Sequence, residues 1–216
     1  MRLFPLLLAG LILAGCSSSR PAVTDSDSEL EELFWARQDS ARMNFSEAEV
    51  AFMSGMIGHH AQALIMSRLA EPNGAAPPIR TLAARIINAQ NDEIATMQTW
   101  LRDRGQPVPE VHIDGLNLMI HGAGDHHSHT DMPGMLTQGQ LNELAEANGP
   151  EFDRLFLTYM IQHHQGAITM VEDLFGTDGA GQDEAAFKVA SDINVDQITE
   201  IARMERMLAA MTEDGP

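Results

Sequence analysis

The sequence carries one helical pattern twice. Residues 56 to 66 read MIGHHAQALIM and residues 160 to 170 read MIQHHQGAITM, so each stretch has adjacent histidines between methionines at the same spacings. A second match follows each stretch, and it pairs Gln90, Glu93 and Met97 with Gln197, Glu200 and Met204. Two correspondences in the same order indicate a duplicated helix pair. Two helical hairpins, each with one apolar side, bury those sides best against each other, so we predict an all-α four-helix bundle with a pseudo-twofold axis.

Local signals mark the ends of the helices. Ser46 with Glu49 and Thr137 with Gln140 form capping-box patterns, and prolines open two further helices. The predicted helices span about residues 46–69, 78–105, 137–148, 150–176 and 183–211. Between the second and third of these, the region of about residues 105–136 contains HGAGDHHSHTDMPGM. We expect this region to be a loop rich in His and Met.

The amino terminus is typical of an exported lipoprotein. Twelve apolar residues from Leu3 to Ala14 are too few to span a bilayer but suit a signal peptide, and Gly15 precedes the only cysteine, Cys16. The small residues before Cys16 resemble a bacterial lipobox, which implies cleavage after residue 15 and acylation of Cys16. Ser17 then favours the outer membrane, facing the periplasm. The alternative is an ordinary secreted protein with a free Cys16 thiol.

The remaining chain divides by composition. Residues 16–28 are small and polar and predict a flexible tether, residues 29–44 predict a short accessory helix, and residues 45–211 predict the duplicated bundle. The charge is −18, from 13 Lys and Arg against 31 Asp and Glu, so a nucleic acid is not an expected partner. The same charge attracts cations, although a solvated acidic surface explains it equally well.

The repeated histidines and methionines are candidate metal ligands. On a helix they fall on one side of each repeat. Buried imidazoles need partners for both ring nitrogens, which a metal ion and a carboxylate would supply together. The candidate ligands are Met56, His59, His60, Met66, Met160, His163, His164 and Met170, and the candidates for a surrounding shell are Glu93, Met97, Glu200 and Met204. Methionine as core filler and a metal-free layer of His–Glu hydrogen bonds are the alternatives.

The ligand types favour copper. Thioethers bind Cu(I) well, imidazole suits copper, zinc, nickel and iron, and thiolates are unsuitable in an oxidising compartment. The central loop adds candidates for a second site, for Cu(II) or zinc: His121, His126, His127, His129, Met132 and Met135, with His112 and Met119 nearby. A polar linker is the alternative for this loop.

These motifs resemble the family known as domain of unknown function 305. The resemblance covers about residues 45–211 and depends on the doubled Met, His-His, Met pattern, the MPGM of residues 132–135, and the Gln, Glu-Ile, Met pattern of the second helices. It implies a ferritin-like helical bundle exported to the periplasm or cell surface. Characterised relatives bind copper and support copper tolerance.

The leading hypothesis is a non-enzymatic lipoprotein of the bacterial envelope that buffers, sequesters or transfers copper, with a copper-handling protein as its partner. Its copper affinity is expected to fall as pH drops through about 6 to 7. One alternative is a metal-free structural or interaction module. Another is a ferritin-like di-iron oxidase, which is disfavoured because no Glu is followed by His three residues later.

Overall fold

The computed structural model describes residues 25–122 and 132–213, and the chain divides into two compact units, Met1–Gln38 and Asp39–Pro216. Helix α1 (Asp25–Arg42) covers most of the predicted accessory helix. The side chains of Leu30, Leu33 and Phe34 in this helix are exposed. Within the described ranges, no helix combines the length and apolar character that a membrane span requires.

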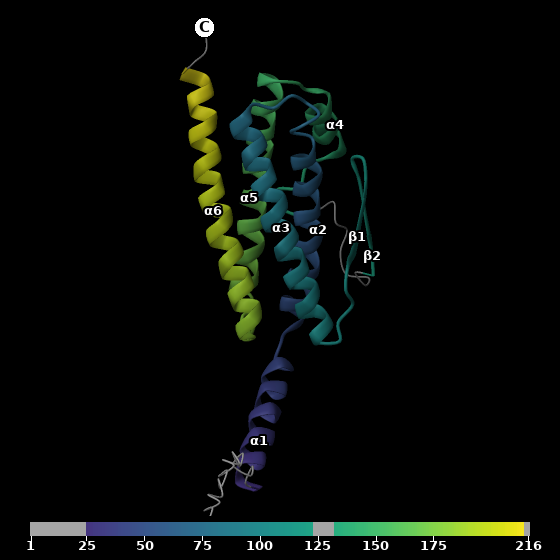
Figure 1. Cartoon of the computed structure of the whole chain (residues 1–216), viewed down its shortest axis with the longest axis vertical. Helices are drawn as coiled ribbons and strands as arrows, with labels where there is room; N and C mark the ends of the chain where they lie inside the picture. The colour runs from purple at the N-terminus through teal and green to yellow at the C-terminus, as the bar shows by residue number, and fades with distance from the viewer. Residues whose placement is uncertain (1–24, 123–131, 214–216) are drawn as a thin grey trace, which may run out of the picture. The chain divides into compact units, whose positions relative to one another are not determined.

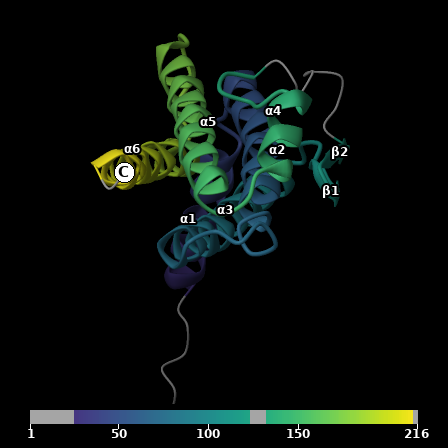
Figure 2. The same cartoon turned by 90° about the horizontal axis from the view of Figure 1, so that it is seen from above.

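The second unit is the predicted four-helix bundle of two hairpins. The first hairpin consists of α2 (Glu47–Arg68) and α3 (Pro77–Asp103), and the second consists of α5 (Pro150–Gly176) and α6 (Glu184–Glu213). The four helices lie side by side (Figure 1). Seen end-on, they follow the order α2, α3, α6, α5 around the bundle, and each neighbouring pair is in contact (Figure 2). The sequence prediction of the fold class is confirmed.

Local chemistry places the helix ends close to their predicted positions. Ser46 and Glu49 form the expected capping box at the start of α2, and prolines occupy the first turns of α3 and α5. The same pattern at Thr137 and Gln140 begins the short helix α4 (Gln138–Glu146), which packs on α5. Glu49 is buried and also accepts a hydrogen bond from the backbone N–H of Asp183 (3.0 Å), so this cap ties α2 to the start of α6.

The central region differs from the predicted loop because it contains a β-hairpin. Strand β1 (Glu110–Asp114) pairs antiparallel with β2 (Asn117–His121), and Gly115 in the turn adopts a φ of 58°. Every second side chain of each strand is half-buried against the bundle, and both strands contact α2. The hairpin lies alongside α2 in Figure 1.

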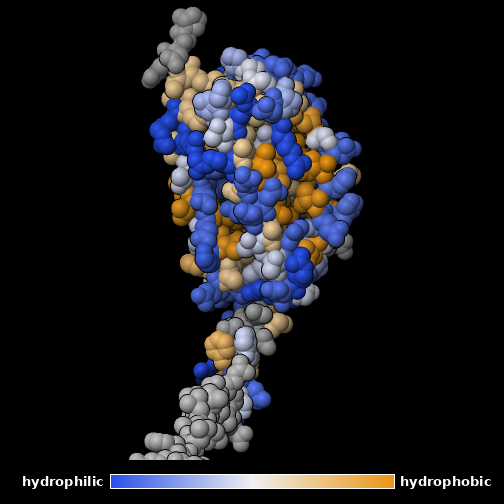
Figure 3. All heavy atoms as spheres, in the orientation of Figure 1, coloured by the Kyte–Doolittle hydropathy of each residue, from blue (hydrophilic) through white to orange (hydrophobic). Residues whose placement is uncertain are grey.

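Helix α2 is the most enclosed element of the bundle, with every residue from Phe52 to Ser67 buried. Apolar side chains form two core clusters. One contains Phe52 and Ile57 of α2 with Val171 of α5, and the other contains Met66 of α2 with Phe152 and Phe156 of α5. The paired histidines lie between these clusters along both helices. On the face shown in Figure 3, hydrophilic side chains cover both ends of the bundle, and apolar side chains are exposed between them.

Candidate functional site

Four histidines form a fully buried layer where α2 and α5 meet. His59 and His60 come from the middle of α2, and His163 and His164 come from the middle of α5, and each has 0% exposure. Helical geometry turns consecutive residues about 100° apart. One histidine of each pair therefore faces the opposite α2 or α5 helix, while the other faces the second helix of its own hairpin.

The outer histidine of each pair contacts a glutamate of its own hairpin. His60 Nε2 lies 2.7 Å from the Glu93 carboxylate on α3, and His164 Nε2 lies 2.7 Å from the Glu200 carboxylate on α6. The His164 contact is a hydrogen bond, whereas the His60 contact has the same length without hydrogen-bond alignment. These matching distances place the two repeats in equivalent arrangements.

The inner histidines pack against each other. The ring centroids of His59 and His163 are 3.9 Å apart, with the rings tilted by 38°. His59 Nε2 lies 3.0 Å from the Pro133 carbonyl, and His163 Nε2 lies 3.0 Å from the His59 carbonyl. A carbonyl only accepts, so Nε2 is the protonated nitrogen in both rings and donates to it.

The inner pair is held in the neutral form. Burial, with the nearby His60 and His164, lowers the pKa of His59 to about 3 against the opposing effect of its hydrogen bond to the Pro133 carbonyl. Burial also lowers the pKa of His163 well below its usual value, with His59, His164 and His60 adding to the effect. A neutral ring with hydrogen on Nε2 has its lone pair on Nδ1, which is the form that coordinates a metal.

The Nδ1 atoms of all four histidines are buried and have no hydrogen-bond partner among the described residues. Buried polar atoms almost always have a hydrogen-bond partner, so four such atoms in one layer make it a candidate ligand-binding site. Nevertheless, within residues 25–122 and 132–213, no three His, Cys, Asp or Glu side chains form a ready-made metal-binding group. A metal in this layer would need further ligands, and methionine thioethers are the available type.

Methionines flank the layer in two equivalent sets. Each set draws two members from one hairpin and one from the other. Met56 and Met97 belong to one core cluster, against which the partly buried Met170 packs, and the buried Met160, Met204 and Met66 belong to the other. The sequence repeat relates the two sets residue by residue: Met56 corresponds to Met160, Met97 to Met204 and Met170 to Met66. Met97 and Met204, which the sequence prediction put in a surrounding shell, are both fully buried in these clusters.

The segment from Met132 to Leu136 contacts both α2 and α5. A Cβ atom added to Gly55 of α2 would lie 3.4 Å from both Met132 Sδ and Met170 Cε. On α5, a Cβ atom at Gly166 would lie 2.0 Å from the Pro133 carbonyl oxygen, so only glycine allows this approach. The segment therefore brings a further thioether to the helices and covers the His59 ring.

A family model described as "Domain of unknown function (DUF305)" matches residues 49–208. The chain belongs to the DUF305 family. The solved structure of a DUF305 fragment from Deinococcus radiodurans is 28% identical, with a TM-score of 0.62 over 77% of this chain and 98% of that chain. CopM in its Cu(II)-bound form is also 28% identical, with a TM-score of 0.56 over 75% of this chain and 96% of that one. Among curated proteins, no significant match exists.

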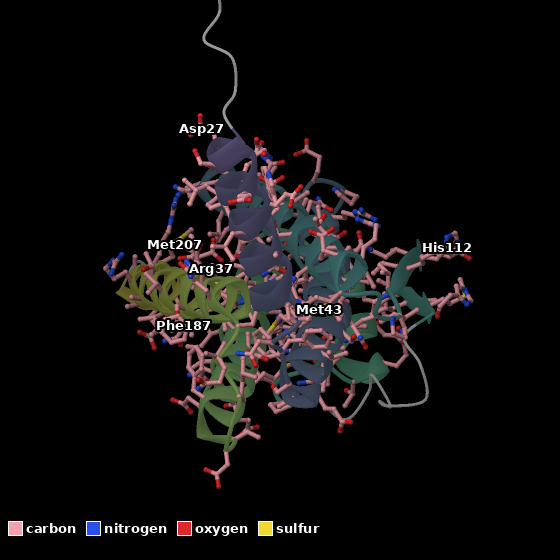
Figure 4. The ribbon with its side chains drawn as sticks, turned by 90° about the horizontal axis from the view of Figure 1, so that it is seen from below. Asp27, Arg37, Met43, His112, Phe187 and Met207 are labelled. Carbon is pink, nitrogen blue, oxygen red and sulfur yellow. The ribbon has the colours of Figure 1, made fainter. Side chains whose placement is uncertain are left out.

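Other predicted residues of this DUF305 protein lie outside the histidine layer. His121 ends β2 and is exposed, and Met119 is 39% exposed. His112 is exposed on β1, on the opposite side of the bundle from Phe187 (Figure 4). Met132 and Met135 were expected to join a His-rich loop site, but they belong to the segment packed on the bundle. The remaining predicted positions lie outside the described residues: Cys16, His126, His127 and His129.

Sequence reasoning missed two features of the DUF305 site. Gln62 binds both backbone groups of Leu136, since its Oε1 accepts from Leu136 N–H (2.7 Å) and its Nε2 donates to the Leu136 carbonyl (3.0 Å). Pro133 contacts His59 through its backbone carbonyl, and a backbone group leaves no recognisable signal in the sequence. The Gln62 contact could have been suspected, because a polar residue lies inside an otherwise apolar helical stretch.

Proposed function

We propose that this chain is a non-enzymatic copper-binding protein of the bacterial envelope, which holds copper through the four-histidine layer and the flanking methionines. The observation that carries the proposal is the set of four buried, unpartnered Nδ1 atoms in one layer. The neutral state of His59 and His163 favours coordination, because no proton has to leave these rings.

Ligand chemistry supports copper over harder metals. The two methionine sets supply three thioethers on each side of the layer, and thioethers prefer Cu(I). Glu93 and Glu200 would orient the outer rings as carboxylates commonly do for metal-bound histidine. CopM, which was crystallised in Cu(II)-, Cu(I)- and Ag-bound forms, is 28%, 29% and 28% identical to this chain in those forms.

The proposal also covers where the protein is located and what it does with copper. Signal peptide processing before Cys16 and acylation of that residue would anchor the protein in the outer membrane, with the bundle in the periplasm. The proposed role is buffering, sequestration or transfer of copper to a copper-handling protein. Zinc or Cu(II) at the central His-rich segment is a further part of the proposal.

A metal-free structural bundle is the second candidate. It is favoured by the engagement of every outer histidine with a glutamate and every inner histidine with a carbonyl. A buried polar layer can specify helix register without a metal. This candidate leaves the four Nδ1 atoms unexplained.

Copper titration separates the two candidates. The chain that begins at Ser17 would be titrated with Cu(II), and with Cu(I) under anaerobic conditions, beside the double variant His59→Gln/His163→Gln. Glutamine retains an N–H donor for the carbonyl contacts but lacks the imidazole lone pair. We expect the variant to remain folded and to lose at least one bound ion.

The control variant is His112→Gln/His121→Gln, which removes two exposed histidines of the hairpin. It should leave the binding of the layer intact. Equal stoichiometry and affinity in the wild type and the His59/His163 variant would refute the layer as the copper site. Absence of copper binding by the wild type would favour the metal-free bundle.

A further inference from the structure

An acidic seam joins the histidine layer to solvent along the contact between α3 and α6. The seam contains Glu93 of α3 with Asp196 and Glu200 of α6. The Glu93 and Glu200 side chains are 18% and 21% exposed, whereas the His60 and His164 rings that they contact are 0% exposed. Each glutamate therefore touches water on one side and a buried imidazole on the other.

Asp196 lies at the outer side of this seam. Its side chain is exposed, yet its pKa is raised by partial burial and by the negative charges of Glu93, Glu200 and Asp192. Asp196 precedes Glu200 by four residues on α6, so the two carboxylates share a face of that helix, and α6 contacts α3, which carries Glu93. Such a group of carboxylates concentrates cations from solution.

The buried side of the seam has unsatisfied polar groups. Gln90 is 1% exposed, and both atoms of its amide lack a partner, while Gln197 is 2% exposed and has an unpartnered Oε1. Each glutamine lies one turn before the seam glutamate on its own helix, so it shares that face. The Nδ1 atoms of His60 and His164, whose rings contact the seam glutamates, are likewise buried and without a partner among the described residues.

The other sides of the layer are closed. His59 and His163 cover each other at the contact between α2 and α5, and the Pro133 carbonyl lies on His59. Gln62 fixes the adjoining backbone at Leu136 through two hydrogen bonds. Among the described residues, the seam is thus the part of the surroundings that combines partial exposure with negative charge.

We propose that the seam formed by Glu93, Asp196 and Glu200 is the route by which a soft metal cation enters and leaves the histidine layer. This inference depends on the proposed metal-binding function. Carboxylate oxygens attract a Cu(I) or Ag(I) ion by charge but are poor ligands for it, so the ion would pass to imidazole and thioether groups instead of remaining in the seam.

The test measures rates as well as affinity. Ag(I) is a suitable probe because it needs no reductant, and nitrate salts avoid silver chloride. The chain that begins at Ser17 would be mixed rapidly with silver held by a coloured chelator, and release would be followed with excess chelator. The variants are Asp196→Asn and Asp196→Lys, with Asp103→Asn as the matched control, since Asp103 is exposed at the far end of α3.

At low ionic strength we expect uptake to slow about 3-fold in Asp196→Asn and about 10-fold in Asp196→Lys. Release should slow by a similar factor, so that affinity changes much less than either rate. Uptake by Asp103→Asn should match the wild type. About 0.5 M sodium nitrate should remove most of the difference, because the Debye length then falls to a few ångströms.

The outcomes separate this inference from the proposed function. A wild-type protein that takes up no silver overturns both. Silver uptake at unchanged rates in both Asp196 variants overturns the entry route and leaves the binding function intact. A large loss of affinity without slower uptake also overturns it, because Asp196 would then act on the bound state.

Discussion

The imidazole of His59 packs 3.9 Å from that of His163, and both rings use Nε2 on a backbone carbonyl. Burial disfavours the charged form of both rings, so both are held in the neutral form. The sequence alone placed the loss of copper affinity near pH 6 to 7. Because the pKa of His59 is about 3, we expect the loss of copper bound to this ring at more acidic pH.

Acidification should destabilise the fold through His59. Its pKa is about 6.5 when unfolded and about 3 when folded, so between these values the unfolded chain binds more protons. The free energy of unfolding therefore falls progressively as pH drops below 6.5, by up to about 1.4 kcal/mol per pH unit.

Urea unfolding at pH 7.0 and 4.5 measures this loss. In His59→Gln the loss between the two pH values should be smaller than in the wild type by about 2 kcal/mol. His112→Gln is the control, since His112 is exposed. An equal loss in wild type and His59→Gln would contradict the neutral buried state.

Replacement of methionine by leucine should separate the roles of sulfur and of packing. The two triple variants are Met56→Leu/Met97→Leu/Met170→Leu and Met66→Leu/Met160→Leu/Met204→Leu. Each exchange conserves volume and costs less than about 1.5 kcal/mol. We expect both proteins to fold and to bind less Ag(I) than the wild type, as measured by equilibrium dialysis with metal analysis. Retention of full silver binding in both would show that these methionines are only core residues.

Gly166→Ala should displace the segment that covers His59. The new Cβ atom would lie 2.0 Å from the Pro133 carbonyl oxygen and 2.6 Å from Gly134 Cα, which are backbone atoms with little freedom to move. We expect a loss of about 1–3 kcal/mol in the free energy of unfolding and weaker copper binding.

Gly139→Ala is the control for this substitution. Its Cβ atom would meet nothing closer than the Thr137 hydroxyl at 3.8 Å, and alanine favours the helix by up to about 1 kcal/mol. Denaturant unfolding and copper titration of both variants check the prediction. Wild-type stability in Gly166→Ala would show that the segment does not pack on α5 as described.

Asp183→Ala should strongly destabilise the bundle. The buried Asp183 carboxylate pairs with Arg104, accepts from Trp100 Nε1 (2.9 Å), and accepts from the Ala186 N–H at the start of α6 (2.8 Å). Removing one partner of a buried ion pair costs about 3–5 kcal/mol. Asp192→Ala breaks the exposed pair with Lys188 and should cost less than about 1 kcal/mol.

The stabilising effect of the Asp183 carboxylate depends on pH. Burial alone would raise the pKa of Asp183, but hydrogen bonds from Trp100 and Arg104 lower it overall. Its stabilising effect is therefore present above its usual pKa near 3.8 and is lost as pH falls through the lower folded value. Thermal unfolding of wild type and Asp183→Ala should converge at strongly acidic pH, and a constant gap would contradict this.

The helices were predictable because their signals are local. The capping box at Ser46 and Glu49 depends on neighbouring residues alone, and the repeat shows which faces of the helices belong together. The hairpin at residues 110–121 also had a local signal. Val111 and Ile113 alternate with polar residues before Asp114 and Gly115, a pair typical of tight turns.

The contacts that enclose the histidine layer could not be predicted from local sequence signals. The Pro133 carbonyl on His59 joins residues 74 positions apart, and a carbonyl group is present at every residue. The Asn73 side chain likewise donates to the distant carbonyls of Ala145 and Ala147 (2.8 and 2.7 Å). Such contacts depend on how distant backbones approach one another, which helix periodicity does not determine.

Each set of three methionines combines residues from both hairpins. Met56 and Met97 come from the first hairpin and are completed by Met170 of the second, and the converse holds for Met160, Met204 and Met66. One hairpin by itself could build neither group. An ancestor with one hairpin would have acquired such a group only by pairing with an identical copy, and joining the two copies in one chain makes the pairing independent of protein concentration.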